Sequence, residues 1–169
     1  MATTHPETHP SFRAALRHLH RGEAEDARAL LEPLHEAHPE NVEIILNLGG
    51  SYVLLERYDD ARAILEEAAT RNPDMANLWV NLAAARLGRL EESSADQQAG
   101  AIAAYEQALQ ADPDAHNVHY MLGLIYQTQE NHLQAVTHLM RAVEQNPEDR
   151  HAQSLLQAVS RELARNSKS

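Results

Sequence analysis

The sequence predicts an all-α protein built as a solenoid of antiparallel helix pairs. Apolar residues recur at the i, i+3, i+4 and i+7 spacing of short amphipathic helices. Small residues return at one fixed position in successive segments, as expected of helices that cross closely. Prolines end these segments at near-regular intervals, at Pro39, Pro73, Pro113 and Pro147.

The clearest segment, residues 45–73, predicts two short helices joined by a tight turn. Gly49 and Ala61 are expected where the two helices cross, because a larger side chain would hold the backbones apart. One such pair cannot bury its apolar face alone, so it needs neighbouring pairs. The two apolar stripes consist of Ile45, Leu48 and Tyr52, then Ala61, Leu65 and Ala68.

The same pattern returns four times along the chain. The intervals between the prolines are 34, 40 and 34 residues, so the third unit carries an insertion of six residues. Two small positions recur without exception in all four units. They are Ala15, Gly49, Ala83 and Gly123 in the first helix and Ala27, Ala61, Ala101 and Ala135 in the second.

This 34-residue pattern resembles the tetratricopeptide repeat (TPR) family over about residues 8–148. The resemblance implies a right-handed superhelical solenoid whose first helices line a concave groove for peptides or partner helices. The first unit departs most from the pattern, with Ser11 at the bulky position and His18 at the tyrosine position. A terminal unit with one neighbour missing is expected to be the weakest match.

Taken in order, residues 1–9 are predicted to be disordered. Four repeats follow at about 8–41, 42–75, 76–115 and 116–149. The insertion at about 89–99 is polar and is expected in solvent, either as a tolerated loop or as a partner contact. A capping helix is predicted at 149–165, because Gln157 replaces the small crossing residue, and the tail at 166–169 should fray.

Composition limits the classes of partner. The formal net charge of −11 argues against nucleic acid and anionic membranes, which need basic surfaces. The absence of cysteine removes disulfides, thiolate nucleophiles and thiolate metal sites. No apolar run reaches the roughly 18 residues that a membrane span needs, and no secretory signal is visible, so a cytoplasmic location without membrane insertion is expected.

The resemblance allows the groove lining to be predicted from the repeat register. Asn47 and Asn81 are equivalent, and their amides could bind a peptide backbone whatever its sequence. The apolar rows also include Leu19, Gly50, Val53 and Leu87. The residues predicted to line the groove are Phe12, Leu16, Glu43, Leu46, Asn47, Asn77, Val80, Asn81, Ala84, Asn117, Tyr120, Leu124 and Gln127.

No catalytic or cofactor motif accompanies this groove. The pairs His35/His38 and His116/His119 have helical i, i+3 spacing, but a third ligand at a defined spacing is missing. Adjacent acids such as Glu66 and Glu67 point in different directions on a helix and cannot act as a pair. The sequence therefore predicts a protein-interaction module without enzymatic activity or cofactor. The alternative is a self-assembling scaffold whose groove is filled by another copy of the chain.

Overall fold

The structure, a computed structural model, describes residues 9–166 of the chain. Residues 1–8 of the segment predicted to be disordered, and residues 167–169 of the predicted tail, lie outside the described range. His9 caps the first helix instead of belonging to a disordered segment, since its Nδ1 accepts a hydrogen bond from the Ser11 backbone N–H at 3.3 Å. Asn166 is still helical.

Within the described range the chain is all-α, which confirms the predicted fold class. The helices are α1 (Pro10–His20), α2 (Ala24–Ala37), α3 (Val42–Leu54), α4 (Tyr58–Arg71), α5 (Ala76–Leu87), α6 (Ala95–Ala111), α7 (Val118–Thr128), α8 (His132–Gln145) and α9 (Arg150–Asn166), with a short 3-10 turn at Leu90–Glu92. Pro33 lies inside α2, and the helix continues through it to Ala37.

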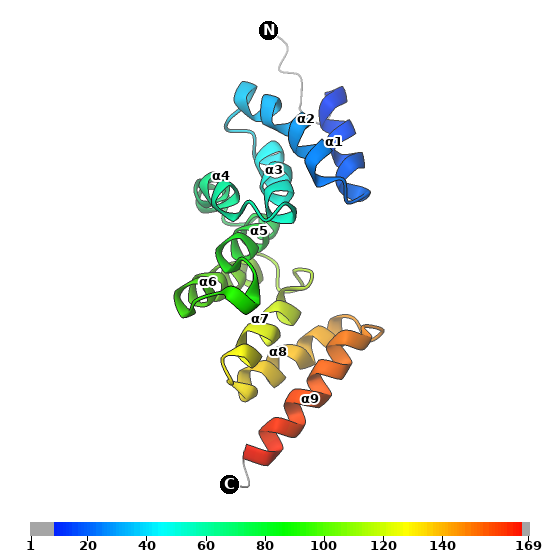
Figure 1. The fold of residues 1–169 in the computed structure, drawn as a ribbon, viewed down its shortest axis with the longest axis vertical. Helices are drawn as coiled ribbons and strands as arrows, with labels where there is room; N and C mark the ends of the chain where they lie inside the picture. The colour runs from blue at the N-terminus through cyan, green and yellow to red at the C-terminus, as the bar shows by residue number, and fades with distance from the viewer. Residues whose placement is uncertain (1–8, 167–169) are drawn as a thin grey trace.

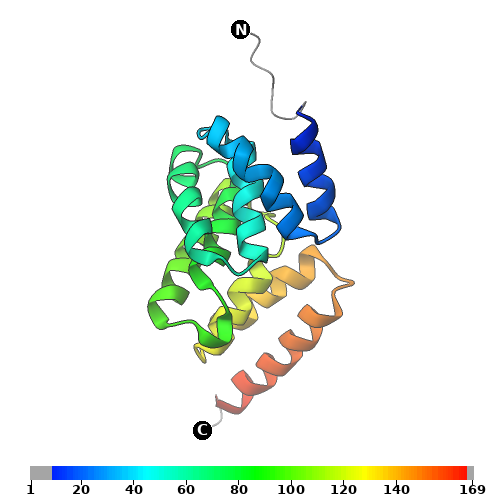
Figure 2. The same ribbon diagram turned by 45° about the horizontal axis from the view of Figure 1, so that its top comes forward.

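Each helix packs against its neighbours in sequence, and α3 also packs against α1 and α5. The helix pairs are stacked along the long axis of the molecule, with α1 and α9 at opposite ends (Figures 1 and 2). This arrangement is a solenoid of helix pairs, in which each repeat touches only adjacent repeats.

The small residues lie at the helix crossings, as predicted. A Cβ atom added to Gly49 would lie 2.7 Å from two side-chain carbons of Leu65, and one added to Gly123 would lie 2.7 Å from Leu139 Cγ. Ala15 and Ala83, the equivalent residues of repeats one and three, are fully buried. Close backbone approach is therefore why these positions exclude large side chains.

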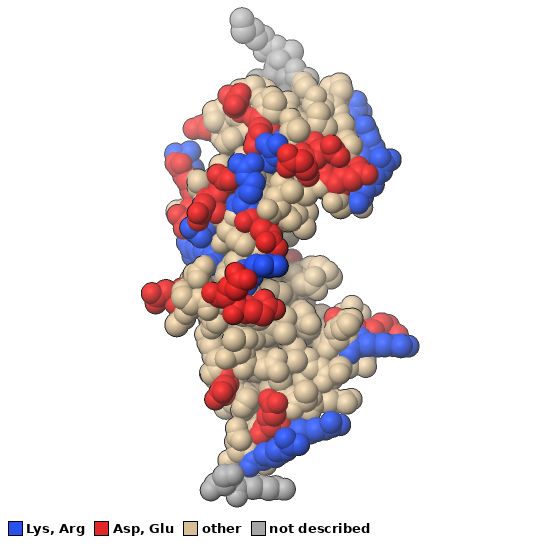
Figure 3. All heavy atoms as spheres, in the orientation of Figure 1, with Lys and Arg blue, Asp and Glu red and all other residues tan. Residues whose placement is uncertain are grey.

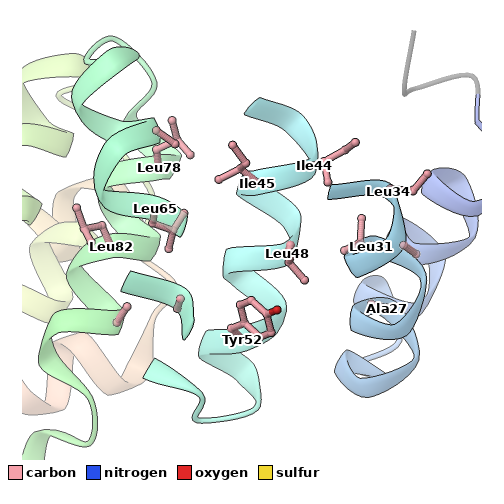
Figure 4. Close-up of a cluster of buried hydrophobic side chains, with 14 of the residues drawn as sticks. Ala27, Leu31, Leu34, Ile44, Ile45, Leu48, Tyr52, Leu65, Leu78 and Leu82 are labelled. Carbon is pink, nitrogen blue, oxygen red and sulfur yellow. The ribbon is translucent and has the colours of Figure 1, made fainter. Parts of the chain in front are cut away.

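The largest core cluster joins the first two repeats to α5. In Figure 4, Ile44 and Leu48 of α3 point toward α2, whereas Ile45 points to the opposite side, toward Leu78. A helix in the middle of the stack thus buries two faces, and α3 has six buried residues to supply them. Two smaller clusters hold together α5 to α7 and α8 to α9.

The insertion in repeat three adds the 3-10 turn and lengthens α6 to 17 residues, against 14 in α2, α4 and α8. Ser94 and Gln97 form a capping box at the start of α6. We expected this segment in solvent, but Gln98 is only 7% exposed. Its Nε2 donates to Ser93 Oγ at 3.1 Å, and its Oε1 accepts from Gln129 Nε2 at 3.0 Å. The insertion therefore also connects repeats three and four.

The junction between repeats three and four differs from the others. Six residues separate Ala111 from Val118, whereas four residues separate the repeats elsewhere. Asn117 in this link has a left-handed φ of 61°. α5 and α7 make little contact, although the preceding first helices, α3 and α5, pack together. The first helices therefore pack less closely between α5 and α7 than between α3 and α5.

Candidate partner-binding groove

Helices α1, α3 and α5 enclose an open hollow of about 380 Å³. Its floor combines aliphatic side chains with amide groups, a composition suited to an apolar anchor on a polypeptide. The lining residues are Leu19, Leu46, Asn47, Gly50, Val53, Leu54, Asn77, Val80 and Asn81.

Eight residues predicted for the groove or its apolar rows meet in this hollow, namely Leu19, Leu46, Asn47, Gly50, Val53, Asn77, Val80 and Asn81. The sequence interpretation missed Leu54, whose side chain is 61% exposed. Its position was readable, since Leu54 lies one helical turn after Gly50 on the same face of α3. Leu54 is the most exposed large apolar side chain of the hollow.

The two asparagines already make hydrogen bonds within the protein. Asn47 Nδ2 donates to the Glu43 carbonyl at 2.7 Å, within α3. Asn81 Nδ2 donates to the Leu46 carbonyl at 3.2 Å and so links α5 to α3. A Cβ atom on Gly50 would lie 3.3 Å from Asn81 Nδ2, so glycine gives this amide room. Each amide has a second N–H and an oxygen acceptor for further partners.

Phe12 does not line the groove, and this part of the prediction is wrong. Its side chain is 2% exposed and belongs to the core cluster with Ala15, Leu31 and Leu34. The physical reason is the neighbouring Ser11, a small residue where later repeats carry Ile45, Trp79 and His119. Phe12 fills the core next to a position that offers no bulk.

Asn117 and Tyr120 belong to a different hollow of about 360 Å³. This second hollow lies between α7, α8 and the start of α9, and Ala142, Gln145 and Asp149 also line it. The two hollows have no lining residue in common. The other predicted residues, Leu16, Glu43, Ala84, Leu124 and Gln127, are half-buried and line neither hollow. Leu87 of the predicted apolar rows is buried in the core and does not line the groove.

A polar cluster behind the hollow fixes α3 against α2. Tyr52 of α3 donates its hydroxyl to Glu32 Oε1 of α2 at 2.9 Å. Arg28 pairs with Glu32, and Arg57 lies over the Tyr52 ring at 4.6 Å. Burial, together with the hydrogen bond to Glu32, raises the pKa of Tyr52 to about 12. The hydroxyl therefore stays protonated and serves as a structural donor.

His116 and His119, considered as a pair from the sequence, do not lie on one helix. His116 lies in the link before α7, and His119 instead meets His138 of α8, with the two Nδ1 atoms 3.0 Å apart. Among the described residues, one group of three potential metal ligands occurs, at His18, Glu23 and Asp26. A hydrogen bond of 2.6 Å between His18 Nδ1 and Glu23 Oε2 accounts for this arrangement.

Comparison with known protein families identifies the repeat. The tetratricopeptide repeat family matches residues 18–86 and 93–159, which is most of the chain. The protein therefore belongs to the tetratricopeptide repeat family. The residues between the two matches, 87–92, include the 3-10 turn of the insertion.

Several solved structures share the fold at low sequence identity. A crystal structure of MamA is 20% identical, with a TM-score of 0.74 and coverage of 89% of this chain and 84% of that one. A thermophilic TPR protein in Thermus thermophilus is 17% identical, with a TM-score of 0.76 and coverage of 92% and 82%. A chain of the APC/C hetero-tetramer Cut9–Hcn1 is 21% identical, with a TM-score of 0.77. The similarity covers 89% of this protein but only 29% of that chain.

No curated protein sequence matches the chain. Among the described helices, none combines the length and apolar character needed to cross a membrane. The family and the fold thus rest on the repeat itself and on structural similarity.

Proposed function

We propose that the protein is a protein-interaction module that holds a peptide or helix of a partner in the hollow between α1, α3 and α5. Its role is recognition rather than catalysis, and protein binding is the usual role of this family. The observation that carries the proposal is Leu54, a leucine left 61% exposed beside Leu46, Val53 and Val80. Exposed apolar groups gathered in a concavity are typical of binding sites.

The apolar side chains and the amides of the hollow would contribute to binding in different ways. A partner side chain would enter among Leu46, Leu54 and Val80, where burial of apolar area supplies affinity. Asn81 would orient the partner backbone through the donor and acceptor that its bond to Leu46 leaves over. A neutral hydrogen bond of this kind contributes about 0.5–1.5 kcal/mol.

End-to-end stacking of copies is disfavoured by the polar ends of the solenoid. On α1, Ala14 and Arg17 stand where later first helices bury a residue against the preceding repeat. At the other end, Gln157 of α9 stands at the position of Gly49 and is exposed, so no second helix can cross closely there. The residues equivalent to Ala14 and Arg17 in the later repeats are all buried. They are Leu48 and Ser51 in α3, Leu82 and Ala85 in α5, and Leu122 and Ile125 in α7.

The test compares two leucines of equal exposure in pull-downs from native lysate. Leu54→Glu places a charge in the hollow, and Leu133→Glu places one on α8, where the leucine is 63% exposed. Because both side chains are exposed, both variants should fold, which circular dichroism checks. We expect Leu54→Glu to lose the partner and Leu133→Glu to keep it.

Retention of every partner by folded Leu54→Glu would move the binding site away from this hollow. Light scattering of the purified protein separates the alternative. If the wild type is a dimer that Leu54→Glu dissociates, another copy of the chain occupies the hollow.

A further inference from the structure

A stripe of exposed arginines runs along the outer face of α1. Arg13, Arg17 and Arg21 follow one another at intervals of four residues, so they lie on one side of the helix and its C-cap. All three are exposed, and His20 beside them is exposed as well. No aspartate or glutamate occurs between residues 9 and 22. Figure 3 shows this basic edge on the outer side of α1, at the upper right.

This stripe differs from helices α2 to α8 in its lack of ion pairs among the described residues. Among the described residues, Arg13, Arg17 and Arg21 pair with no carboxylate, and the nearby Glu23 and Asp26 lie against His18 instead. Every arginine from α2 to α8 does have a carboxylate partner. These are Arg28, Arg57, Arg62, Arg71, Arg86, Arg89 and Arg141.

Helix stability alone does not explain the stripe. Cations in the last turn of a helix interact favourably with its negative end, which accounts for Arg17 and Arg21. Arg13 lies before that turn. The adjacent Ala14 is only half-buried, so no described helix covers this face.

We propose that the outer face of α1 binds an acidic segment of a different protein through Arg13, Arg17 and Arg21. Residues four apart on a helix are about 6 Å apart along its axis. An extended chain places every second side chain on one face at a similar spacing of about 6.6 Å. A segment with a glutamate at every second position can therefore set one carboxylate against each guanidinium, which binds carboxylates with good geometry.

Charge favours an acidic protein segment as the ligand of this face over nucleic acid and over a second copy of the chain. The net charge of −11 repels a polyanion of high charge density, whereas a short acidic segment meets only the local basic field. Between copies, ten of the 25 aspartates and glutamates already pair with an arginine of the same chain. The opposite end of the solenoid also carries exposed cations, Arg150 and Arg161, which would repel α1 of a stacked copy.

The test measures fluorescence anisotropy of a labelled peptide of alternating glutamate and serine with the full-length protein. Arg17→Glu is compared with Arg71→Glu, an exposed and ion-paired arginine of α4 whose reversal changes the net charge equally. We expect Arg17→Glu to weaken binding about tenfold at low salt and Arg71→Glu to change it by less than about twofold. Arg17→Lys should bind nearly as the wild type does.

Arg13→Glu provides a second variant should Arg17→Glu fail to fold. It should weaken binding of the peptide by a similar factor. Equal losses in the stripe variants and Arg71→Glu would overturn the proposal, since general charge would then explain binding. Tighter binding of a single-stranded oligonucleotide than of the peptide would also overturn it. So would a wild-type dimer, seen by light scattering, that dissociates in Arg17→Glu.

Discussion

Gly49 and Gly100 are both helical glycines, but their surroundings differ. A Cβ on Gly49 would overlap Leu65, whereas one on Gly100 would meet only Arg86 Cδ at 3.6 Å. Alanine favours a helix over glycine by about 1 kcal/mol. Gly100→Ala should therefore stabilise the fold by about 0.4–1 kcal/mol. Gly49→Ala should destabilise it by about 1–3 kcal/mol, because overpacking outweighs the helical gain.

Urea denaturation of the two variants beside the wild type measures both changes. A gain of stability in Gly49→Ala would show that α3 and α4 can separate at no cost. Each substitution is the other's control, since both add one methyl group to a helix interior.

His119 and His138 make repeat four sensitive to acid. Burial lowers the pKa of both rings. Arg141 lowers the pKa of His119 further, while Asp114 and Glu144 act in the opposite direction. His119 lowers the pKa of His138 further. The unfolded chain, with ordinary histidine pKa values of 6.5, therefore binds protons before the folded protein does. Stability is complete above about pH 6.5 and decreases as the pH falls toward the folded pKa values.

Thermal melts between about pH 7.5 and pH 5 test this for the wild type and His138→Gln. The melting temperature of the variant should decrease less on acidification, because one buried ring that opposes protonation is gone. His116→Gln, at an exposed histidine outside the pair, is the matched control. An unchanged pH dependence in His138→Gln would contradict the assignment.

At the scale of the helix, α9 covers the last repeat. Ala152 and Val159 are fully buried, and Leu155 and Leu156 pack against the cluster of Ala135 and Leu139. Deleting residues 150–169 should lower the melting temperature clearly or cause aggregation, since each large apolar side chain withdrawn from burial costs about 1.5–3 kcal/mol. Deleting only residues 167–169 is the control. A long truncation as stable as the parent would show that α9 is not a cap.

The helices were predictable because apolar periodicity marks them and a proline follows α2, α4, α6 and α8. Pro73 ends α4 by such a local effect. Gln98 could not be placed in the same way. Its burial depends on Gln129, which lies 31 residues further along the chain in the next repeat. Tertiary pairing of this kind leaves no local pattern.

At the scale of the whole molecule, the groove was predicted by assuming that every repeat packs alike. That assumption places Leu46, Val80 and Asn81 in one hollow, because α3 and α5 do pack together. It fails for Tyr120, since α7 begins late and has little contact with α5. A repeat register fixes which face a residue occupies, but the angle between repeats depends on the link that joins them.

The polar ends of the solenoid also constrain how such a gene can lengthen. A unit copied from the middle brings the buried pair Leu48 and Ser51, or its equivalents, and finds a matching surface on either side. A unit joined beyond α1 would have to bury Arg17, and one joined after α9 would have to cross Gln157. Copies of an internal repeat should therefore lengthen the solenoid more readily than units added beside Arg17 or Gln157.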